Sequence, residues 1–207
     1  MDARSRTCDR GAGTSPWIHR WYVAEMPEPR FAICDLDGTL IDSDAALVNA
    51  FVALGVTRSE ISFGHVIADE CLRLGISLGD YVHAYDTEAA KPFPGVDELI
   101  GVLDDWAICS NKHVESGTAE LTRLAWRPRA AMFADAFNGP KRLAPLLEAL
   151  HLDPSRVVFV GDTDHDRTCA HEAGVDFALA AWNPRAVERV GDIALKHPSD
   201  LIEVLGL

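Results

Sequence analysis

One short segment near residue 35 constrains this chain more than any other. Residues 31–34 are apolar and β-prone, and they lead directly into Asp35 and Asp37, which are followed by Gly38 and Thr39. A short apolar run that ends at turn residues is typical of a buried strand. Two carboxylates at the end of such a strand repel each other, so a bound cation or a retained proton would explain their pairing. The pattern predicts metal-assisted phosphoryl transfer with an aspartate nucleophile and an aspartate acid/base, and a solvated hairpin turn is the alternative.

The bulk composition excludes several classes of protein. The chain has 207 residues, enough for one domain of ordinary size plus a small insertion. Its net charge is -13 and it has no basic stripe, which argues against a nucleic-acid partner. No apolar run reaches the roughly 18 residues that a membrane span needs. An acidic protein that binds an anion must supply positive charge locally.

The cysteines indicate neither a disulfide framework nor a zinc site, because their number is odd and no C-x-x-C spacing occurs. We expect reduced thiols and therefore a cytoplasmic location. The five cysteines are Cys8, Cys34, Cys71, Cys109 and Cys169.

From residue 31 onward, short apolar runs alternate with helical patterns. This alternation predicts an α/β fold, a Rossmann-like parallel sheet with helices on both faces. Ligands of such sheets bind at the carboxyl ends of the strands. The expected strands are 31–34, 106–109, 134–137, 157–160, 177–180 and 193–195. The expected helices include 96–103, 115–124, 143–150 and 166–173.

The alternation is interrupted between residues 44 and 92, where no strand is evident. Three helical patterns fill the gap, at 44–54, 59–74 and 78–90, and Gly55 and Gly75 are natural helix ends. We therefore expect a small all-helical cap at 44–91, inserted after the first strand of a core made of 30–43 and 92–207. We expect one of the cationic or titratable residues of the cap to reach the site and contact a substrate anion. The candidates are Arg58, His65, Arg73, His83 and Lys91.

Two further groups of polar residues can bind an anion. Ser110, Asn111 and Lys112 follow the expected strand 106–109. A hydroxyl and backbone N–H groups at a strand end can hold a phosphate oxygen, although such residues also cap helices. Lys141 stands just before an expected helix, where a solvated surface lysine is the alternative.

A third group of polar residues follows the expected strand 157–160. It contains Asp162, Asp164 and Asp166 within five positions. Three acids so close together suit a hard cation with oxygen ligands. The alternative is an acidic loop that caps the next helix.

In their order, these features resemble the motifs of the haloacid dehalogenase superfamily, most closely its phosphoglycolate-phosphatase-like branch. The resemblance runs from about residue 31 to residue 207. Its four motifs match residues 35–39, Ser110, Lys141, and residues 161–163 with Asp166. The branch usually has proline after the third-motif lysine, where this chain has Arg142, so Arg142 or Lys112 could share the role of Lys141.

The resemblance implies a role for each motif residue. Asp35 would attack phosphorus and form an aspartyl-phosphate, and Asp37 would protonate the leaving oxygen and then activate water. Lys141 would neutralise the nucleophile and the phosphate. The implied cofactor is Mg²⁺, held by the Asp35 carboxylate, the Asp37 backbone carbonyl and Asp162, with Asp166 either as a further ligand or directly behind the ligands. The implied phosphate-binding residues are Gly38, Thr39, Ser110, Asn111 and Lys141.

The expected function is hydrolysis of a small phosphate monoester by a Mg²⁺-dependent phosphatase, with a small phosphorylated metabolite as the partner. A phosphomutase using the same aspartate pair and a non-catalytic binding module with this fold are the alternatives. A dehalogenase is disfavoured, because its reaction has no use for an acid at position 37 or for Mg²⁺. Neither the particular ester nor the oligomeric state can be read from the residues.

Residues 1–29 differ from the rest of the chain. They are rich in Arg, Gly, Pro and Trp and show no helical or strand period. They lack the apolar stretch of a signal peptide, and Asp2 and Asp9 argue against a transit peptide. We interpret them as a tail outside the core, with Met26 as an alternative start.

Deletion of residues 1–25 should leave both activity and melting temperature nearly unchanged, because a tail outside the core contributes no packing. Thermal unfolding and turnover of the full and shortened chains provide the comparison. A collapse of either quantity would refute the interpretation as a tail.

Overall fold

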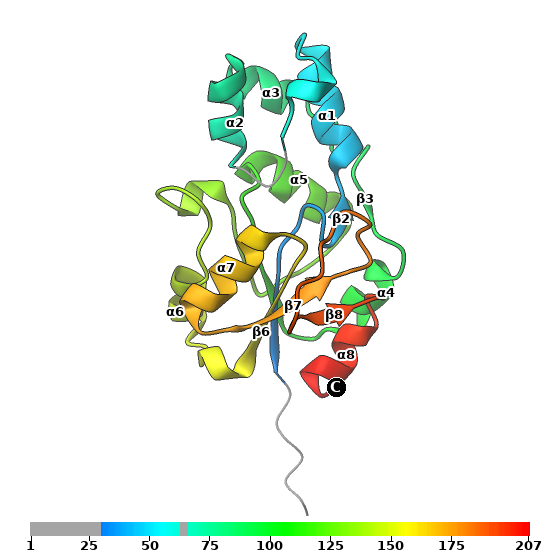
Figure 1. Cartoon of the computed structure of the whole chain (residues 1–207), viewed down its shortest axis with the longest axis vertical. Coiled ribbons are helices and arrows are strands. Elements are labelled where there is room, and N and C mark those ends of the chain that lie inside the picture. The colour runs from blue at the N-terminus through cyan, green and yellow to red at the C-terminus, as the bar shows by residue number, and fades with distance from the viewer. Residues whose placement is uncertain (1–29, 63–65) are drawn as a thin grey trace, which may run out of the picture.

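The computed structural model describes residues 30–62 and 66–207 (Figure 1). The predictions for the tail, residues 1–29, and for the cap residue His65 concern residues outside this part of the chain. Among the described helices, none has both the length and the apolar character needed to cross a membrane.

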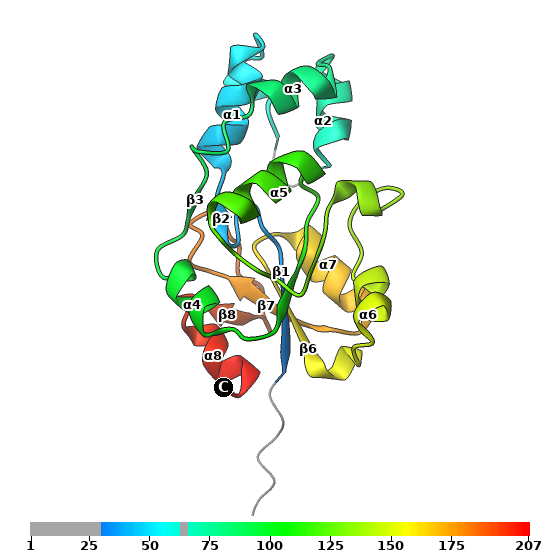
Figure 2. The same ribbon diagram turned by 180° about the vertical axis from the view of Figure 1, so that it is seen from behind.

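A parallel sheet of six strands forms the centre of the molecule (Figures 1 and 2). Its spatial order is β5-β4-β1-β6-β7-β8, and every neighbouring pair is parallel. The central strands are buried on both faces, which explains why they are continuous apolar runs. The strands are β1 (Phe31–Cys34), β4 (Trp106–Cys109), β5 (Ala130–Met132), β6 (Val157–Gly161), β7 (Asp176–Ala180) and β8 (Ile193–Leu195).

The two faces of the sheet carry separate hydrophobic cores, because successive side chains of a strand point to opposite faces. Ala32 and Cys34 pack into one core, and Ile33 packs into the other. The predicted Rossmann-like sheet with helices on both faces is therefore confirmed. On the Ala32 face lie α4 (Val96–Val102), α5 (Val114–Arg123) and α8 (Asp200–Leu205), and on the Ile33 face lie α6 (Ala144–Leu150) and α7 (Asp164–Ala173).

The strand order places the functional loops side by side. Cys34, the last residue of β1, is in register with Ile108 of β4 on one side and with Val160 of β6 on the other. The loops that follow these three strands therefore leave the sheet at one edge. In open parallel sheets this is where ligands bind.

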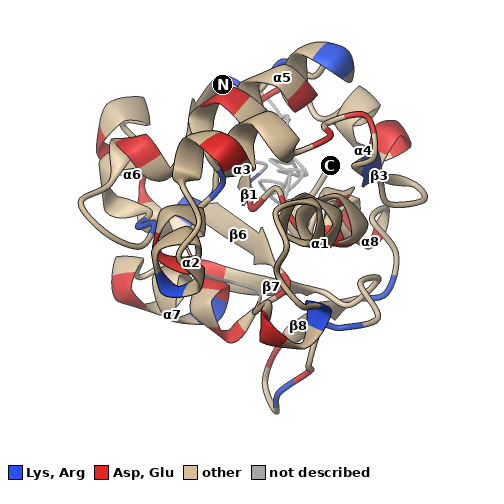
Figure 3. Cartoon of the chain, turned by 90° about the horizontal axis from the view of Figure 1, so that it is seen from above, with Lys and Arg blue, Asp and Glu red and all other residues tan. Residues whose placement is uncertain are grey.

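A helical insert follows β1 and lies beyond that edge of the sheet (Figure 1). It begins and ends in a short antiparallel pair, β2 (Ile41–Asp42) with β3 (Lys91–Pro92). Figure 3 looks down on the insert, whose helices surround the ends of β1 and β6 in that view. Between the paired strands lie α1 (Asp44–Ala53), the 3₁₀ turn η1 (Arg58–Glu60), α2 (Ile67–Leu74) and α3 (Leu78–Ala84).

The strand predicted at 134–137 is wrong. The fifth strand is Ala130–Met132, and residues Ala134–Ala136 form a 3₁₀ turn. Phe133 and Phe137 are both buried while Asp135 between them is exposed. A strand would place residues 133, 135 and 137 on the same face, so an exposed Asp135 between two buried phenylalanines does not fit the alternation of a strand.

The helices of the insert are shorter than predicted. The pattern at 59–74 is a 3₁₀ turn followed by α2, and the helix expected to reach residue 90 ends at Ala84. Beyond it, the Asp86 carboxylate accepts a hydrogen bond from the Glu88 backbone N–H at 2.9 Å, which forms a turn instead. The β2–β3 pair and α8 were not predicted, since each is only a few residues long.

The glycine at position 117 is required by packing. A Cβ added at Gly117 would lie 2.4 Å from Cε1 of the buried Phe133 ring, whereas one added at the helical Gly101 would meet nothing within 4 Å. We expect Gly117→Ala to lower the free energy of unfolding by about 1–2 kcal/mol, because overpacking outweighs the gain in helix propensity. The matched control Gly101→Ala should raise it by about 0.5–1 kcal/mol. Urea titration measures both, and equal effects would contradict this account of the packing.

Candidate active site

The loops after β1, β4 and β6 surround one cavity of about 330 Å³. Most of the predicted site residues line it, although they come from distant parts of the chain. Thr39 and Asp166 are buried behind the lining, and Arg142 is exposed. The predicted residues that line the cavity are Asp35, Asp37, Gly38, Ser110, Asn111, Lys112, Lys141 and Asp162.

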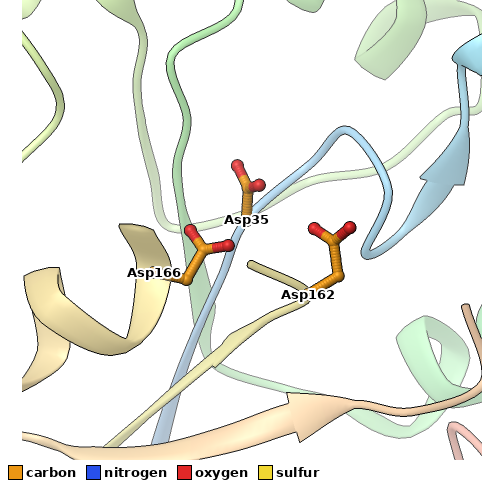
Figure 4. A group of neighbouring side chains, drawn as sticks. All are labelled: Asp35, Asp162 and Asp166. Carbon is orange, nitrogen blue, oxygen red and sulfur yellow. The ribbon is translucent and has the colours of Figure 1, made fainter. Parts of the chain in front are cut away.

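Three buried carboxylates form the centre of the site (Figure 4). One oxygen each from Asp35, Asp162 and Asp166 lies within 4.8 Å of the others. Burial, opposed in part by Lys141, raises the pKa of Asp35 to about 6. Burial, together with the charges of Asp35 and Asp166, raises the pKa of Asp162 to about 8. The cluster therefore holds more negative charge than its surroundings neutralise.

Lys141 is the ammonium that this cluster contains. Its Nζ lies 2.7 Å from Oδ1 of Asp35 and 2.6 Å from Oδ1 of Asp166. Burial by itself would lower the pKa of Lys141, but Asp166 and Asp35 raise it above the ordinary value. Asn111 holds the lysine in place, because its side-chain oxygen accepts a hydrogen bond from the Lys141 backbone N–H at 2.7 Å.

The carboxylates can hold a divalent cation. Asp166 is already engaged: Oδ1 meets Lys141, and Oδ2 accepts hydrogen bonds from the backbone N–H and the hydroxyl of Thr163 at 3.0 and 2.6 Å. Asp35 and Asp162 line the cavity. The Lys141 ammonium is the single positive charge set against the three acids of the cluster. An all-oxygen set of donors with excess negative charge suits a hard cation such as Mg²⁺.

Asp162 is fixed by neighbours from other loops. The Asn183 side-chain amide donates to Oδ2 of Asp162 at 2.9 Å and to the Gly38 carbonyl at 2.8 Å, and the Thr39 hydroxyl donates to Oδ1 at 3.3 Å. Gly38 has a φ of +77°, and a Cβ there would lie 2.5 Å from Oδ2 of Asp162. Thr39 thus contacts an acid rather than the cavity, and the Gly38 N–H donates to the Ile41 carbonyl at 2.8 Å.

Asp37 pairs with a different lysine from the one that contacts Asp35. Its Oδ1 lies 2.7 Å from Nζ of Lys112, which also contacts Glu120 at 3.1 Å and Tyr85 at 2.8 Å. Lys112 therefore pairs with Asp37 instead of sharing the contacts of Lys141. Ser110 is buried beside it, and its hydroxyl accepts a hydrogen bond from the Lys112 backbone N–H at 3.4 Å.

Several contacts were missed by the sequence reading. Tyr85 and Asn183 lie 27 and 21 positions from Lys112 and Asp162, the predicted residues that they contact. Glu120 lies closer to its partner Lys112, on the helix that follows it, but none of the three belongs to a short motif. Only Asn183 carried a signal, since it closely follows an expected strand. Arg185 lines the cavity and pairs with Asp44 at the start of α1.

The expectation that a cap cation reaches the cavity fails for the four described candidates, none of which lines it. Arg58 donates to Asn49 and Arg73 pairs with Glu70 within the insert, while His83 and Lys91 are exposed. The described residues that the insert contributes to the cavity wall are instead one acid and several apolar or aromatic side chains. They are Asp44, Leu47, Ile67, Tyr81 and Tyr85.

Comparison with known proteins agrees with this geometry. The profile of the family described as haloacid dehalogenase-like hydrolase matches residues 32–180, which include all the acids and lysines above. The chain belongs to this family.

Its relatives and structural neighbours include several hydrolases. Phosphoglycolate phosphatase of Xylella fastidiosa is 29% identical over 192 residues, 77% of this chain and 83% of the relative. N-acetylmuramic acid 6-phosphate phosphatase of Pseudomonas aeruginosa is 24% identical over 210 residues, 83% and 92% of the two chains. A haloacid dehalogenase-like family hydrolase from Streptococcus pneumoniae has the same fold, with a TM-score of 0.62 at 18% identity over 85% of this chain and 98% of that one.

The carboxylate cluster makes the stability of the cation-free protein depend on pH. The folded state keeps the Asp162 proton up to a pKa of about 8, against an ordinary value of 3.8, so stability falls as pH rises through this interval. Asp162→Asn removes the charge. In EDTA we expect it to raise the free energy of unfolding by about 2 kcal/mol at high pH and by little at low pH. Urea titrations at pH 4 and pH 9 measure this, and equal differences at both would contradict it.

Proposed function

We propose that this protein is a Mg²⁺-dependent phosphatase that hydrolyses a small phosphate monoester through an aspartyl-phosphate. The observation that carries the proposal is the placement of Asp35 between Lys141 and Asp162 at the wall of the cavity, with Asp37 beside it. The phosphatases among its relatives support the same class of reaction. A further relative, from Halalkalibacterium halodurans and 24% identical, is named a pyrophosphatase, so its named substrate is a phosphate anhydride rather than a monoester.

In this proposal Asp35 is the nucleophile. Lys141 contacts its Oδ1 and favours the ionised form, against the burial that raises its pKa to about 6. Mg²⁺ would be held by Asp35, Asp162 and the Asp37 backbone carbonyl, where its charge offsets that of the phosphoryl oxygens. Asp166 keeps Lys141 in place, because both of its oxygens are already engaged.

Asp37 is the proposed acid and base. Its carboxyl group would protonate the leaving oxygen as the aspartyl-phosphate forms, and would then take a proton from the water that attacks this intermediate. Its side chain is 32% exposed, so it can reach a substrate in the cavity. The buried Ser110 hydroxyl lines the same cavity and would hold a phosphoryl oxygen, while Asn111 contributes by holding Lys141.

We propose that the helical insert, residues 44–91, acts as a cap that selects the substrate. Its support is the cavity wall that it contributes, in which Leu47, Ile67 and Tyr81 face the catalytic loops. The relatives are named for different phosphorylated compounds, which supports a small phosphorylated metabolite as substrate without selecting one. Four described cysteines are free and buried, which supports a reducing, cytoplasmic setting.

The proposal predicts metal-dependent release of free phosphate that requires Asp35. Asp35→Asn should lower kcat for p-nitrophenyl phosphate by about 10³-fold or more, because the nucleophile is lost. EDTA should abolish the wild-type activity and Mg²⁺ should restore it. The matched control is Asp105→Asn, which should keep full activity. Asp105 is an exposed acid directly before β4 and pairs with Arg129.

Three outcomes would contradict the proposal. Activity that persists in EDTA or in Asp35→Asn would exclude the mechanism. Conversion of one sugar phosphate to another without free phosphate would identify a mutase instead. Inactivity on a broad panel of phosphate esters would favour the non-catalytic binding module.

A further inference from the structure

A buried polar cluster next to the cavity has no part in the roles above. We call Lys112, Glu120 and Tyr85 the Lys112 cluster. The Lys112 ammonium lies 2.7 Å from Oδ1 of Asp37, 3.1 Å from Oε1 of Glu120 and 2.8 Å from the Tyr85 hydroxyl oxygen. The Tyr85 hydroxyl in turn donates to Oε1 of Glu120 at 2.8 Å.

Fold stability alone does not explain this cluster. Glu120 is 0% exposed, Lys112 7% and Tyr85 8%, so a full ion pair has been taken out of water. Buried ion pairs are often no more stable than apolar residues of the same size. In addition, Oε2 of Glu120 is buried without a hydrogen-bond partner in the described chain. A cluster that is costly to bury needs another reason, and its link to Asp37 provides one.

The geometry leaves Lys112 no capacity to bind substrate. An ammonium group has three N–H donors. Asp37, Glu120 and Tyr85 provide three acceptors within 3.1 Å, so every donor is used. Lys112 can therefore influence the reaction only through Asp37, whose other oxygen, Oδ2, makes no hydrogen bond to any described residue.

We propose that Glu120 and Tyr85 are positioning residues that hold Lys112 against Oδ1 of Asp37, so that Oδ2 is aimed at the leaving-group oxygen. Tyr85 lies in the helical insert and Glu120 on α5 in the core, so the cluster also ties the insert to the acid. The inference rests on the proposed function, since it assigns Asp37 the role of acid.

The charges balance through the proposed reaction. As Asp35 forms its bond to phosphorus, the P–O bond to the leaving group breaks and its electron pair stays on that oxygen. The proton on Oδ2 of Asp37 moves to the same oxygen, which leaves a carboxylate beside Lys112. Glu120 balances the lysine while Asp37 is protonated, and Lys112 stabilises the new carboxylate once the proton has gone.

The test compares two leaving groups in Glu120→Gln and Tyr85→Phe. A p-nitrophenolate leaves without a proton, whereas an alkoxide needs one, so only the alkyl ester depends on a correctly aimed acid. The quantity to measure is kcat/KM, because it reports the steps up to formation of the aspartyl-phosphate. We expect it to fall about tenfold or more for glycerol phosphate and less than about threefold for p-nitrophenyl phosphate.

Two controls separate positioning from folding. Glu115→Gln changes an exposed acid on the same helix and should alter neither substrate. Melting temperatures show whether each variant is folded, and Tyr85→Phe keeps the ring that packs in the core, so it remains informative if Glu120→Gln does not fold. An equal fall for both substrates, or no fall for either, would overturn the inference. A wild-type protein that releases phosphate from neither ester would overturn the proposed function instead.

Discussion

The central constraint in this structure is the confinement of three carboxylates in a buried space that contains one ammonium. Asp35, Asp162 and Asp166 come from the loop after β1, the loop after β6 and the first turn of α7. Left alone they repel, and burial strengthens that repulsion. The fold tolerates this because the strand order forces the loops together and the two hydrophobic cores hold the sheet in place. Burial of these charges destabilises the site locally, which the raised pKa values of Asp35 and Asp162 express.

The second constraint is that each of the two acids proposed to react has a separate lysine. Lys141 contacts Asp35, and Lys112 contacts Asp37. Both lysines are buried and each is balanced by a second acid, Asp166 for the first and Glu120 for the second. In the proposed mechanism this separation allows the two aspartates to play different roles although they are only two positions apart, because each has its own charged surroundings.

Much of the site could be predicted from the sequence, because its motifs are local. A strand that ends in Asp35, or one that ends before Asp162, is visible as a run of adjacent residues. The partners that hold these acids are less visible: Asn183 lies 21 positions beyond Asp162, and Glu120 reaches Asp37 only through Lys112, with which it pairs. The wrong strand near Phe133 has a local cause, because the exposed Asp135 between two buried phenylalanines breaks the alternation that a strand requires. Among the cap cations, Arg73 pairs with Glu70 at the i,i+3 spacing of a helix and could have been set aside from the sequence, whereas the Arg58–Asn49 contact joins two separate elements and could not.

The most direct test of the account is to locate the cation itself. Crystals of the protein soaked with Mn²⁺, which takes the same oxygen ligands as Mg²⁺, would show its position by anomalous scattering. We expect one strong peak bonded to carboxylate oxygens of both Asp35 and Asp162, beside the cavity and next to Lys141. A map with no peak there, or with Mn²⁺ held only by exposed acids elsewhere, would contradict it.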